Sequence, residues 1–236
     1  MGWRFATTAS QQSEWDGGLQ PPRASNQKIY IDIMFLDRNE EIEFHFKGYL
    51  PHMHQDGTMQ SVTFRMADSL PQSVCKKLHE QRDKFTQKHP HPWDNETKML
   101  YWKEFGPMQH RLMDKGYGSC LLKYPRFRQV LIDTIAFKDN INYVIDSYVI
   151  MPNHVHMLIL PLANNKIEDI LHSIKRYSAR QINLLAGRTG RFWMKESFDR
   201  LVRNEDDYYR CYHYILANPR FLPPGSFTIY TRDSEY

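Results

Sequence analysis

The sequence predicts an α/β (α+β) fold with a central antiparallel sheet and helices packed on it. Strand-like and helical stretches mix along the chain, and only three residues join the two most strand-like stretches, 143–150 and 154–160. Because so short a connection cannot cross over between parallel strands, these two strands must be antiparallel. A chain of 236 residues is long enough to bury a sizeable core as one domain with appendages.

The N-terminal part is expected to lie outside the main domain. Residues 1–27 are rich in Gln, Ser, Gly and Pro without periodicity, which is typical of a disordered arm. Alternating apolar residues in 29–33 and 42–46 predict an additional hairpin, and residues 60–66 read as a strand that could be the first of the main domain. We therefore divide the chain into an arm (1–27), a hairpin (28–47), a main domain (48–220) and a tail (221–236).

Helices are predicted where apolar residues recur with helical spacing between breakers. A His-Pro-His-Pro segment separates the first two helical stretches, and Pro125 suits the first turn of the third. The expected helices cover residues 72–87, 95–115, 125–138, 167–185 and 206–216.

Composition excludes several classes of protein. The three cysteines are widely spaced and form no C-x-x-C pair, which argues against a disulfide framework and a cysteine zinc site. The longest apolar run, residues 157–163, is too short to span a bilayer, so we expect a soluble, cytoplasmic protein with no membrane partner. The net charge of +4 permits a polyanionic partner without requiring one.

Two histidines stand out in the strand-like segment Met151–Leu160. Successive strand side chains point to opposite faces, so His154 and His156 share one face while Val155 and Met157 take the other. Two imidazoles side by side on a rigid strand suit a divalent metal with open positions. For an isolated His-x-His pair the more common outcome is one hydrogen-bonded and one exposed histidine, so the spacing alone does not decide.

The helix predicted over 167–185 carries a tyrosine and a glutamine at the edge of its apolar face. Tyr177 and Gln181 are four residues apart, so they lie on the same side of the helix, close to Ile170 and Ile174. Because the apolar face must pack on the sheet, both side chains are expected to point toward the surface from which the histidines project. Tyr177 is then either a core tyrosine or a nucleophile beside a metal, with Gln181 as a third ligand, and spacing leaves the two about even.

Two blocks together identify a resemblance. Residues 149–156 (VIMPNHVH) and 171–183 (LHSIKRYSARQIN) resemble the REP-associated tyrosine transposases, relatives of the single-tyrosine HUH transposases, in which HUH denotes His, a hydrophobic residue and His. The similarity extends over roughly residues 48–220. It includes further short matches at residues 48–52, 62–71, 190–193, 198–200, 202–205 and 214–219.

The resemblance implies a ferredoxin-like HUH palm domain whose central antiparallel sheet carries the metal-binding histidines, with the nucleophilic tyrosine on a helix. Carried over by position, His154 and His156 become metal ligands, Tyr177 the nucleophile and Gln181 a further ligand of Mg²⁺ or Mn²⁺. The implied reaction is cleavage and rejoining of single-stranded DNA beside hairpins through a 5′-phosphotyrosine. The implied enzyme is a DNA transposase, that is, a single-strand endonuclease and strand transferase, working as a monomer, although related insertion-sequence enzymes exchange helices within dimers.

Local charge supports a DNA partner. Between Leu171 and Arg203 the chain has eight basic and two acidic residues. The predicted phosphate contacts are Lys175, Arg176, Arg180, Arg188, Arg191, Arg200 and Arg203. Phe192 and Trp193 are either a stacking platform for bases or, more commonly for such a pair, buried core. Two alternatives remain open: a domesticated protein that grips hairpin DNA without cutting it, and a metal-dependent nuclease that uses water.

Overall fold

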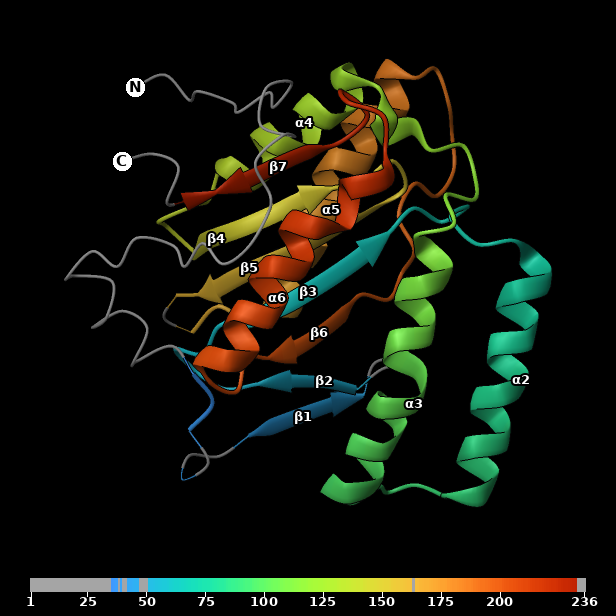
Figure 1. Cartoon of the computed structure of the whole chain (residues 1–236), viewed down its shortest axis with the longest axis vertical. Coiled ribbons are helices and arrows are strands. Elements are labelled where there is room, and N and C mark those ends of the chain that lie inside the picture. The colour runs from blue at the N-terminus through green and yellow to red at the C-terminus, as the bar shows by residue number, and fades with distance from the viewer. Residues whose placement is uncertain (1–34, 38, 40–41, 47–50, 163, 233–236) are drawn as a thin grey trace.

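The structure, a computed structural model, describes residues 35–37, 39, 42–46, 51–162 and 164–232. Strands and helices mix along the chain, as predicted (Figure 1). The strands are β1 (Glu43–Phe46), β2 (Pro51–His54), β3 (Gln60–Arg65), β4 (Tyr143–Ile150), β5 (His154–Pro161), β6 (Phe198–Leu201) and β7 (Thr228–Thr231). The helices are α2 (Gln72–Lys88), α3 (Asn95–Met113), α4 (Pro125–Ala136), α5 (Ile167–Leu185) and α6 (Glu205–Ala217), with 3-10 turns at Leu121–Lys123 and Asn218–Phe221.

A five-stranded antiparallel sheet forms the centre of the fold, in the order β6-β3-β5-β4-β7. This confirms the predicted fold class. β5 lies in the middle of the sheet, and all eight of its residues are buried. It pairs with β3 on one side, where Arg65 lies opposite His154, and with β4 on the other, where Ile150 lies opposite Val155. The end of the sheet where β5 begins is therefore also the end of β3 and of β4.

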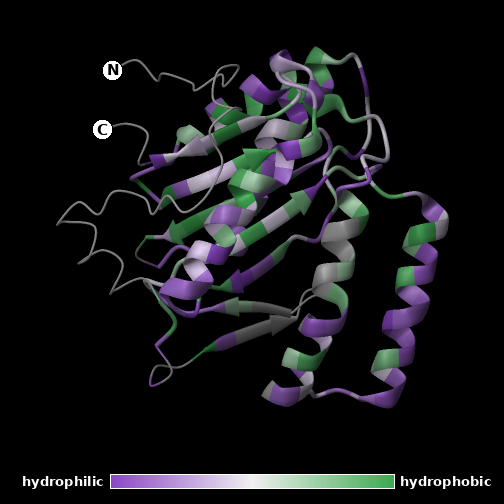
Figure 2. Ribbon diagram, in the orientation of Figure 1, coloured by the Kyte–Doolittle hydropathy of each residue, from purple (hydrophilic) through white to green (hydrophobic). Residues whose placement is uncertain are grey.

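Helices cover both faces of this sheet. Helices α4 and α5 pack on the face that carries Val155, Met157 and Ile159 of β5. Helix α6 packs on the opposite face, where Leu158 contacts the cluster that contains Cys211 and Ile215. Figure 1 shows α6 in front of the sheet with α4 and α5 behind it, and α2 and α3 standing beside it as a pair of helices. Figure 2 shows the green apolar residues gathered on the strands, while α2 is mostly purple.

A bulge in β4 changes the face of the sheet to which its later side chains point. The pairing of β4 with β5 shifts register between Ile145 and Ser147. One extra residue moves the following side chains to the other face, so Ile145 and Tyr148 both point toward α4 and α5 even though they are three residues apart. Val149 then faces α6. The bulged residue, Asp146, accepts a 2.9 Å hydrogen bond from the Tyr208 hydroxyl of α6.

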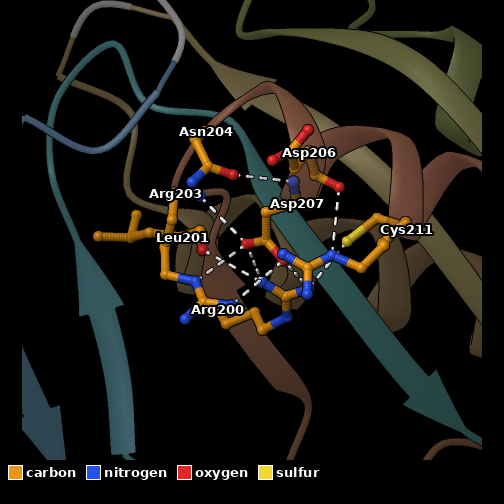
Figure 3. Close-up of polar contacts among 8 residues, drawn as sticks. Arg200, Leu201, Arg203, Asn204, Asp206, Asp207 and Cys211 are labelled. Atoms are coloured by element: carbon orange, nitrogen blue, oxygen red, sulfur yellow. Dashed lines mark hydrogen bonds and ion pairs between the residues drawn. The ribbon is translucent and has the colours of Figure 1, made fainter.

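The start of α6 is held by a buried carboxylate that accepts hydrogen bonds from two arginines. Asp207 is almost completely buried, and its oxygens lie 2.6 Å from Arg200 Nη1 and 3.2 Å from Arg203 Nε. Figure 3 shows both guanidinium groups directed at this carboxylate, with the Asn204 side chain accepting from the Asp207 N–H as the helix cap. Burial alone would raise the pKa of Asp207, but the hydrogen bonds from the two arginines outweigh burial and hold that pKa well below its ordinary value.

Most predicted elements are found within a few residues of their expected ends. Residues 1–27 and 29–33 lie outside the described residues, so the arm and the first strand of the expected hairpin stay predictions. In the described part, β1 pairs with β2, a strand that was not predicted. The short strands β6 and β7 were not predicted, because four-residue strands are too short to show a clear alternation of polar and apolar residues. None of the described helices combines the length and the hydropathy that crossing a membrane needs.

The buried Asp207 gives a test of this packing. We expect Asp207→Asn to lower the free energy of unfolding at neutral pH by about 3 kcal/mol, because the arginines lose the charge that compensates them. The folded pKa of Asp207 is depressed, so its contribution is complete above the unfolded pKa and is lost as the pH falls through the folded pKa. Urea unfolding at a series of pH values measures both effects. In the variant, the free energy of unfolding should not show this decrease at acidic pH.

The exposed neighbour Asp206 supplies the matched control. It lies in the same first turn of α6, so Asp206→Asn removes the same favourable interaction with the helix dipole. We expect that control to lose at most about 1 kcal/mol. Equal losses in the two variants would show that the arginine contacts of Asp207 do not stabilise the fold.

Candidate metal and nucleophile site

The two histidines lie side by side on one face of the sheet, as predicted. His154 and His156 are both buried, and their ring centroids are 4.7 Å apart. Each ring is held through Nδ1: His156 Nδ1 lies 2.8 Å from Thr63 Oγ1, and His154 Nδ1 lies 2.7 Å from Asn153 Oδ1. Since an amide oxygen only accepts, Nδ1 of His154 is protonated in the neutral ring and Nε2 carries the lone pair that a metal takes.

A third donor comes from Asp114, which sequence reasoning did not single out. Asp114 directly follows α3, and its Oδ1 lies 3.6 Å from His154 Nε2. One donor atom from each of Asp114, His154 and His156 lies within 4.8 Å of the others. Among the described residues, these three side chains form the group of histidine, cysteine or acidic residues that could hold a metal ion.

The loop behind Asp114 is fixed by contacts to the start of β5. Asn153 Nδ2 donates to the carbonyls of Met113 and Tyr117, at 3.4 and 3.0 Å. Gly118, in this loop, has a φ of +89°, and a Cβ there would lie 2.4 Å from the Asp68 carbonyl oxygen. Only glycine fits that position without displacing the backbone. The Asp114 carboxylate is therefore placed by a short loop that is hydrogen-bonded to the residue before His154.

The aromatic side chain over the histidines is Tyr214 of α6. Its ring lies edge-on to His156, with centroids 5.0 Å apart, and about a third of the residue, 37%, is exposed. Burial raises the pKa of Tyr214 and the nearby charge of Asp114 raises it further, while a hydrogen bond with Asn218 opposes both effects. Asn218, one helical turn after Tyr214, also hydrogen-bonds Asp114, and its Oδ1 is buried with no hydrogen-bond partner in the described part of the chain.

The donor set fits a divalent cation. Two imidazole nitrogens and a carboxylate oxygen suit Mn²⁺ and related ions, and the buried Oδ1 of Asn218 is a further oxygen of the kind that Mg²⁺ and Mn²⁺ accept. Burial raises the pKa of Asp114 as well as that of Tyr214, so both anionic forms are disfavoured without a positive charge nearby. A divalent cation at this position would stabilise both anions.

Tyr177 and Gln181 do not join the histidines, and the expected placement of both is corrected here. Helix α5 packs on the sheet face that carries Val155 and Met157, which is the face opposite the histidines. Tyr177 is 57% exposed on the outer side of this helix. The expectation that the apolar face of α5 meets the sheet was correct, but the sequence contains no signal for which of the two faces it meets.

A signal for the missed pair was present in the sequence. Tyr214 and Asn218 have the same four-residue spacing as Tyr177 and Gln181, and both belong to the C-terminal block that contributed to the family resemblance. Asp114 lies near the end of the helix predicted over 95–115. Nothing in the local pattern relates that helix end to the histidines, because 40 residues separate Asp114 from His154.

The seven basic residues expected at DNA fall into two groups. Three have partners within the protein: Arg200 and Arg203 bind Asp207, and Lys175 Nζ donates to Lys195 O at 2.8 Å and to Ser197 Oγ at 3.0 Å. Burial lowers the pKa of Lys175 to about 8. The others lie at or near the surface, where they can meet solvent or a ligand: Arg176, Arg180, Arg188 and Arg191.

The aromatic pair after α5 belongs to the hydrophobic core. Phe192 and Trp193 are 2% and 4% exposed, and Trp193 Nε1 donates to Ser178 Oγ at 2.9 Å. The pair is therefore buried against α5 and is not available for stacking with bases. Of the histidines outside the site, His54 contacts Asp56, and His91 stacks on Trp93 with centroids 4.3 Å apart.

The metal site yields a direct test. We expect Asp114→Ala to weaken Mn²⁺ binding by at least about tenfold, because losing a ligand should cost no less than losing an outer-shell partner. Isothermal titration calorimetry of the full chain measures this affinity. Asp133→Ala, an exposed carboxylate on α4, is the control and should bind Mn²⁺ as the wild type does. Unchanged affinity in Asp114→Ala would remove this carboxylate from the site.

Comparison with known proteins finds a family that matches part of the chain. Residues 125–202 match the model of a family described as "Transposase IS200 like", a segment that includes both histidines and α5 and ends before α6. No curated protein matches the chain. The fold is similar to a solved structure of a REP-associated tyrosine transposase bound to a REP hairpin, at 16% identity over 75% of this chain and 72% of that chain, with a TM-score of 0.40. The segment that contains both histidines is thus similar to the IS200-like transposases.

Proposed function

We propose that this protein cuts and rejoins single-stranded DNA by transesterification, with Tyr214 as the nucleophile and a divalent metal held by Asp114, His154 and His156. The observation that carries the proposal is the contact of the Tyr214 ring with His156, beside three metal-binding donors that lie within 4.8 Å of one another. The match of residues 125–202 to a transposase family supports the reaction class. Tyr214 replaces Tyr177 in the predicted mechanism because the two tyrosines lie on opposite faces of the sheet.

The metal would polarise the scissile phosphate and stabilise negative charge on its oxygens. The protein contributes the arrangement around it. Thr63 and Asn153 fix the two imidazole rings, and the loop after α3 presents Asp114. Asn218 hydrogen-bonds both Asp114 and Tyr214, so it sets the position of the phenol relative to the metal ligands. We propose that the Asn218 side chain completes the ligand set.

The chemical step exchanges one phosphodiester bond for another. Tyr214 Oη attacks phosphorus, the bond from phosphorus to the 3′ oxygen breaks, and the products are a 5′-phosphotyrosine and a free 3′-hydroxyl. The phenol gives up one proton and the leaving oxygen takes one up, so the step is balanced. Attack by a 3′-hydroxyl on the phosphotyrosine reverses it. No nucleoside triphosphate is consumed, since the phosphotyrosine bond conserves the energy that rejoining needs.

The proposed substrate is a single strand beside a hairpin. The solved structure similar in fold is described as bound to a REP hairpin, and a strand must present its backbone freely to reach a phenol that is held against a sheet. Tyr214 is partly exposed, so a phosphate can approach it from the solvent side.

Replacing each tyrosine tests the assignment. Incubating the chain with Mn²⁺ and a hairpin-bearing single strand should give a protein–DNA adduct that survives a denaturing gel. We expect Tyr214→Phe to abolish the adduct, because only the hydroxyl is removed, and Tyr177→Phe to form it as the wild type does.

The other outcomes point to different functions. An adduct that persists in Tyr214→Phe and is lost in Tyr177→Phe would place the nucleophile on α5, as first expected from the sequence. Strand cleavage without an adduct in either variant would indicate a nuclease that uses water. Tight hairpin binding with neither cleavage nor adduct would indicate a binding protein without catalytic activity.

A further inference from the structure

We propose that a basic track formed by Arg176, Tyr177, Arg180, Arg188 and Arg191 binds the DNA strand on the face of the sheet opposite the metal site. The strand would pass around the end of the sheet where β5 begins and continue along the outer side of α5. This inference rests on the proposed function, because it supplies the path of the strand beyond the cleaved phosphate. It also gives Tyr177 a role that its exposed position allows.

The first observation is the charge of this part of the chain. The stretch from Ile170 to Lys195 contains six basic residues and no acidic residue. Lys175 is the one whose ammonium group is bound inside, to Lys195 O and Ser197 Oγ. Arg176 and Arg180 are exposed and lie one turn apart on α5, so their side chains are neighbours on the helix surface. Two adjacent arginines on one helix face suit successive phosphates of a nucleic acid backbone.

The second observation is an exposed aromatic residue among these arginines. Tyr177 is 57% exposed and adjoins Arg176 in the chain. A tyrosine on the outer side of a helix adds nothing to the core, whereas exposed aromatic rings among basic residues are the usual platform for the bases of a single strand. This favours a single strand over a duplex, whose bases are stacked and paired inside the helix.

The third observation is that the loop after α5 joins this surface to the metal site. The loop is folded against the helix end, because Arg188 N donates to Asn183 O at 2.9 Å and Asn183 Nδ2 donates to Gly190 O at 2.8 Å. Arg191 is exposed in this loop, and the Arg188 guanidinium lies over the Phe192 ring at 5.5 Å.

The backbone of Met66 and Ala67 then connects the loop to the residue before His154. Ala67 N donates to Phe192 O, and the adjacent Met66 N donates to Asn153 O, each at 2.8 Å. The arginines of the loop therefore lie at the same end of the sheet as the first metal-binding histidine. A strand that leaves the site at this end meets Arg191 and Arg188 first, and Arg180, Tyr177 and Arg176 after them.

Salt dependence of binding tests the track. The probe is a fluorescently labelled single strand flanking a hairpin, bound by the full chain in EDTA, so that no bond is cut. Each phosphate contact contributes about 0.7 to the slope of log affinity against log salt concentration for a single strand, so Arg176→Ala/Arg180→Ala should reduce the slope by about 1.4. Lys84→Ala/Lys138→Ala removes two exposed lysines outside the track and should leave the slope unchanged.

Substitution of the tyrosine separates stacking from charge. Tyr177→Ala should weaken binding of the strand about fivefold or more, whereas Tyr177→Phe keeps the ring and should bind as the wild type does. A wild-type slope in the arginine variant, or equal slopes in the two double variants, would overturn the track. If these variants lost affinity only for a blunt duplex probe and bound the single strand as the wild type does, the choice of a single strand would be overturned.

The result does not depend on the proposed chemistry, because binding is measured without a divalent metal. A chain that shows track-dependent binding but forms no Tyr214 adduct would refute the proposed function and leave the track in place. An adduct that forms normally in the wild type, together with unchanged salt dependence in the arginine variant, would refute the track alone.

Discussion

The position of β5 in the middle of the sheet is the constraint on which the rest of the structure depends. Because it is hydrogen-bonded on both sides, its alternate side chains are fixed on two opposite faces. One face receives Val155, Met157 and Ile159, and the other receives His154 and His156. Each face must be covered by helices, so the helix that covers the histidine face also decides which tyrosine lies beside the histidines. That helix is α6.

Helix α6 is positioned by contacts at both ends. At its start, Asp207 binds Arg200 of β6 and Arg203, which follows that strand. The hydroxyl of Tyr208 donates a hydrogen bond to Asp146 in the bulge of β4. At its end, Tyr214 contacts His156 and Asn218 contacts Asp114, two of the candidate metal ligands. An ion pair at one end of a rigid helix thus helps to hold a phenol at the other, although it takes no part in the chemistry. Arg200 and Arg203, which were expected to contact DNA, therefore direct their guanidinium groups at Asp207, although 48% of the Arg203 side chain remains exposed.

In the proposed function, the metal site and the surface around it contribute differently to the binding of DNA. Near the metal ligands the described side chains supply carboxylate, imidazole and phenol, and burial disfavours the charged forms of Asp114 and Tyr214. Positive charge there would come from a bound cation. The fixed positive charge of the protein lies instead on α5 and the loop after it, where arginines remain at or near the surface. Under the proposed function, such an arrangement would attract the DNA backbone without competing with a bound metal for the scissile phosphate.

The local pattern of the sequence determined much of the fold of this protein. The alternation of polar and apolar residues in 154–160 placed both histidines on one face, and the three-residue connection before His154 made the sheet antiparallel, because strand geometry and connection length are local properties. Only the tertiary structure decided that α5 covers the other face and that Asp114, Tyr214 and Asn218 meet the histidines. An amphipathic helix must bury its apolar side, but either face of the sheet buries it equally well. That choice depends on contacts between residues far apart in the chain, which no local spacing records.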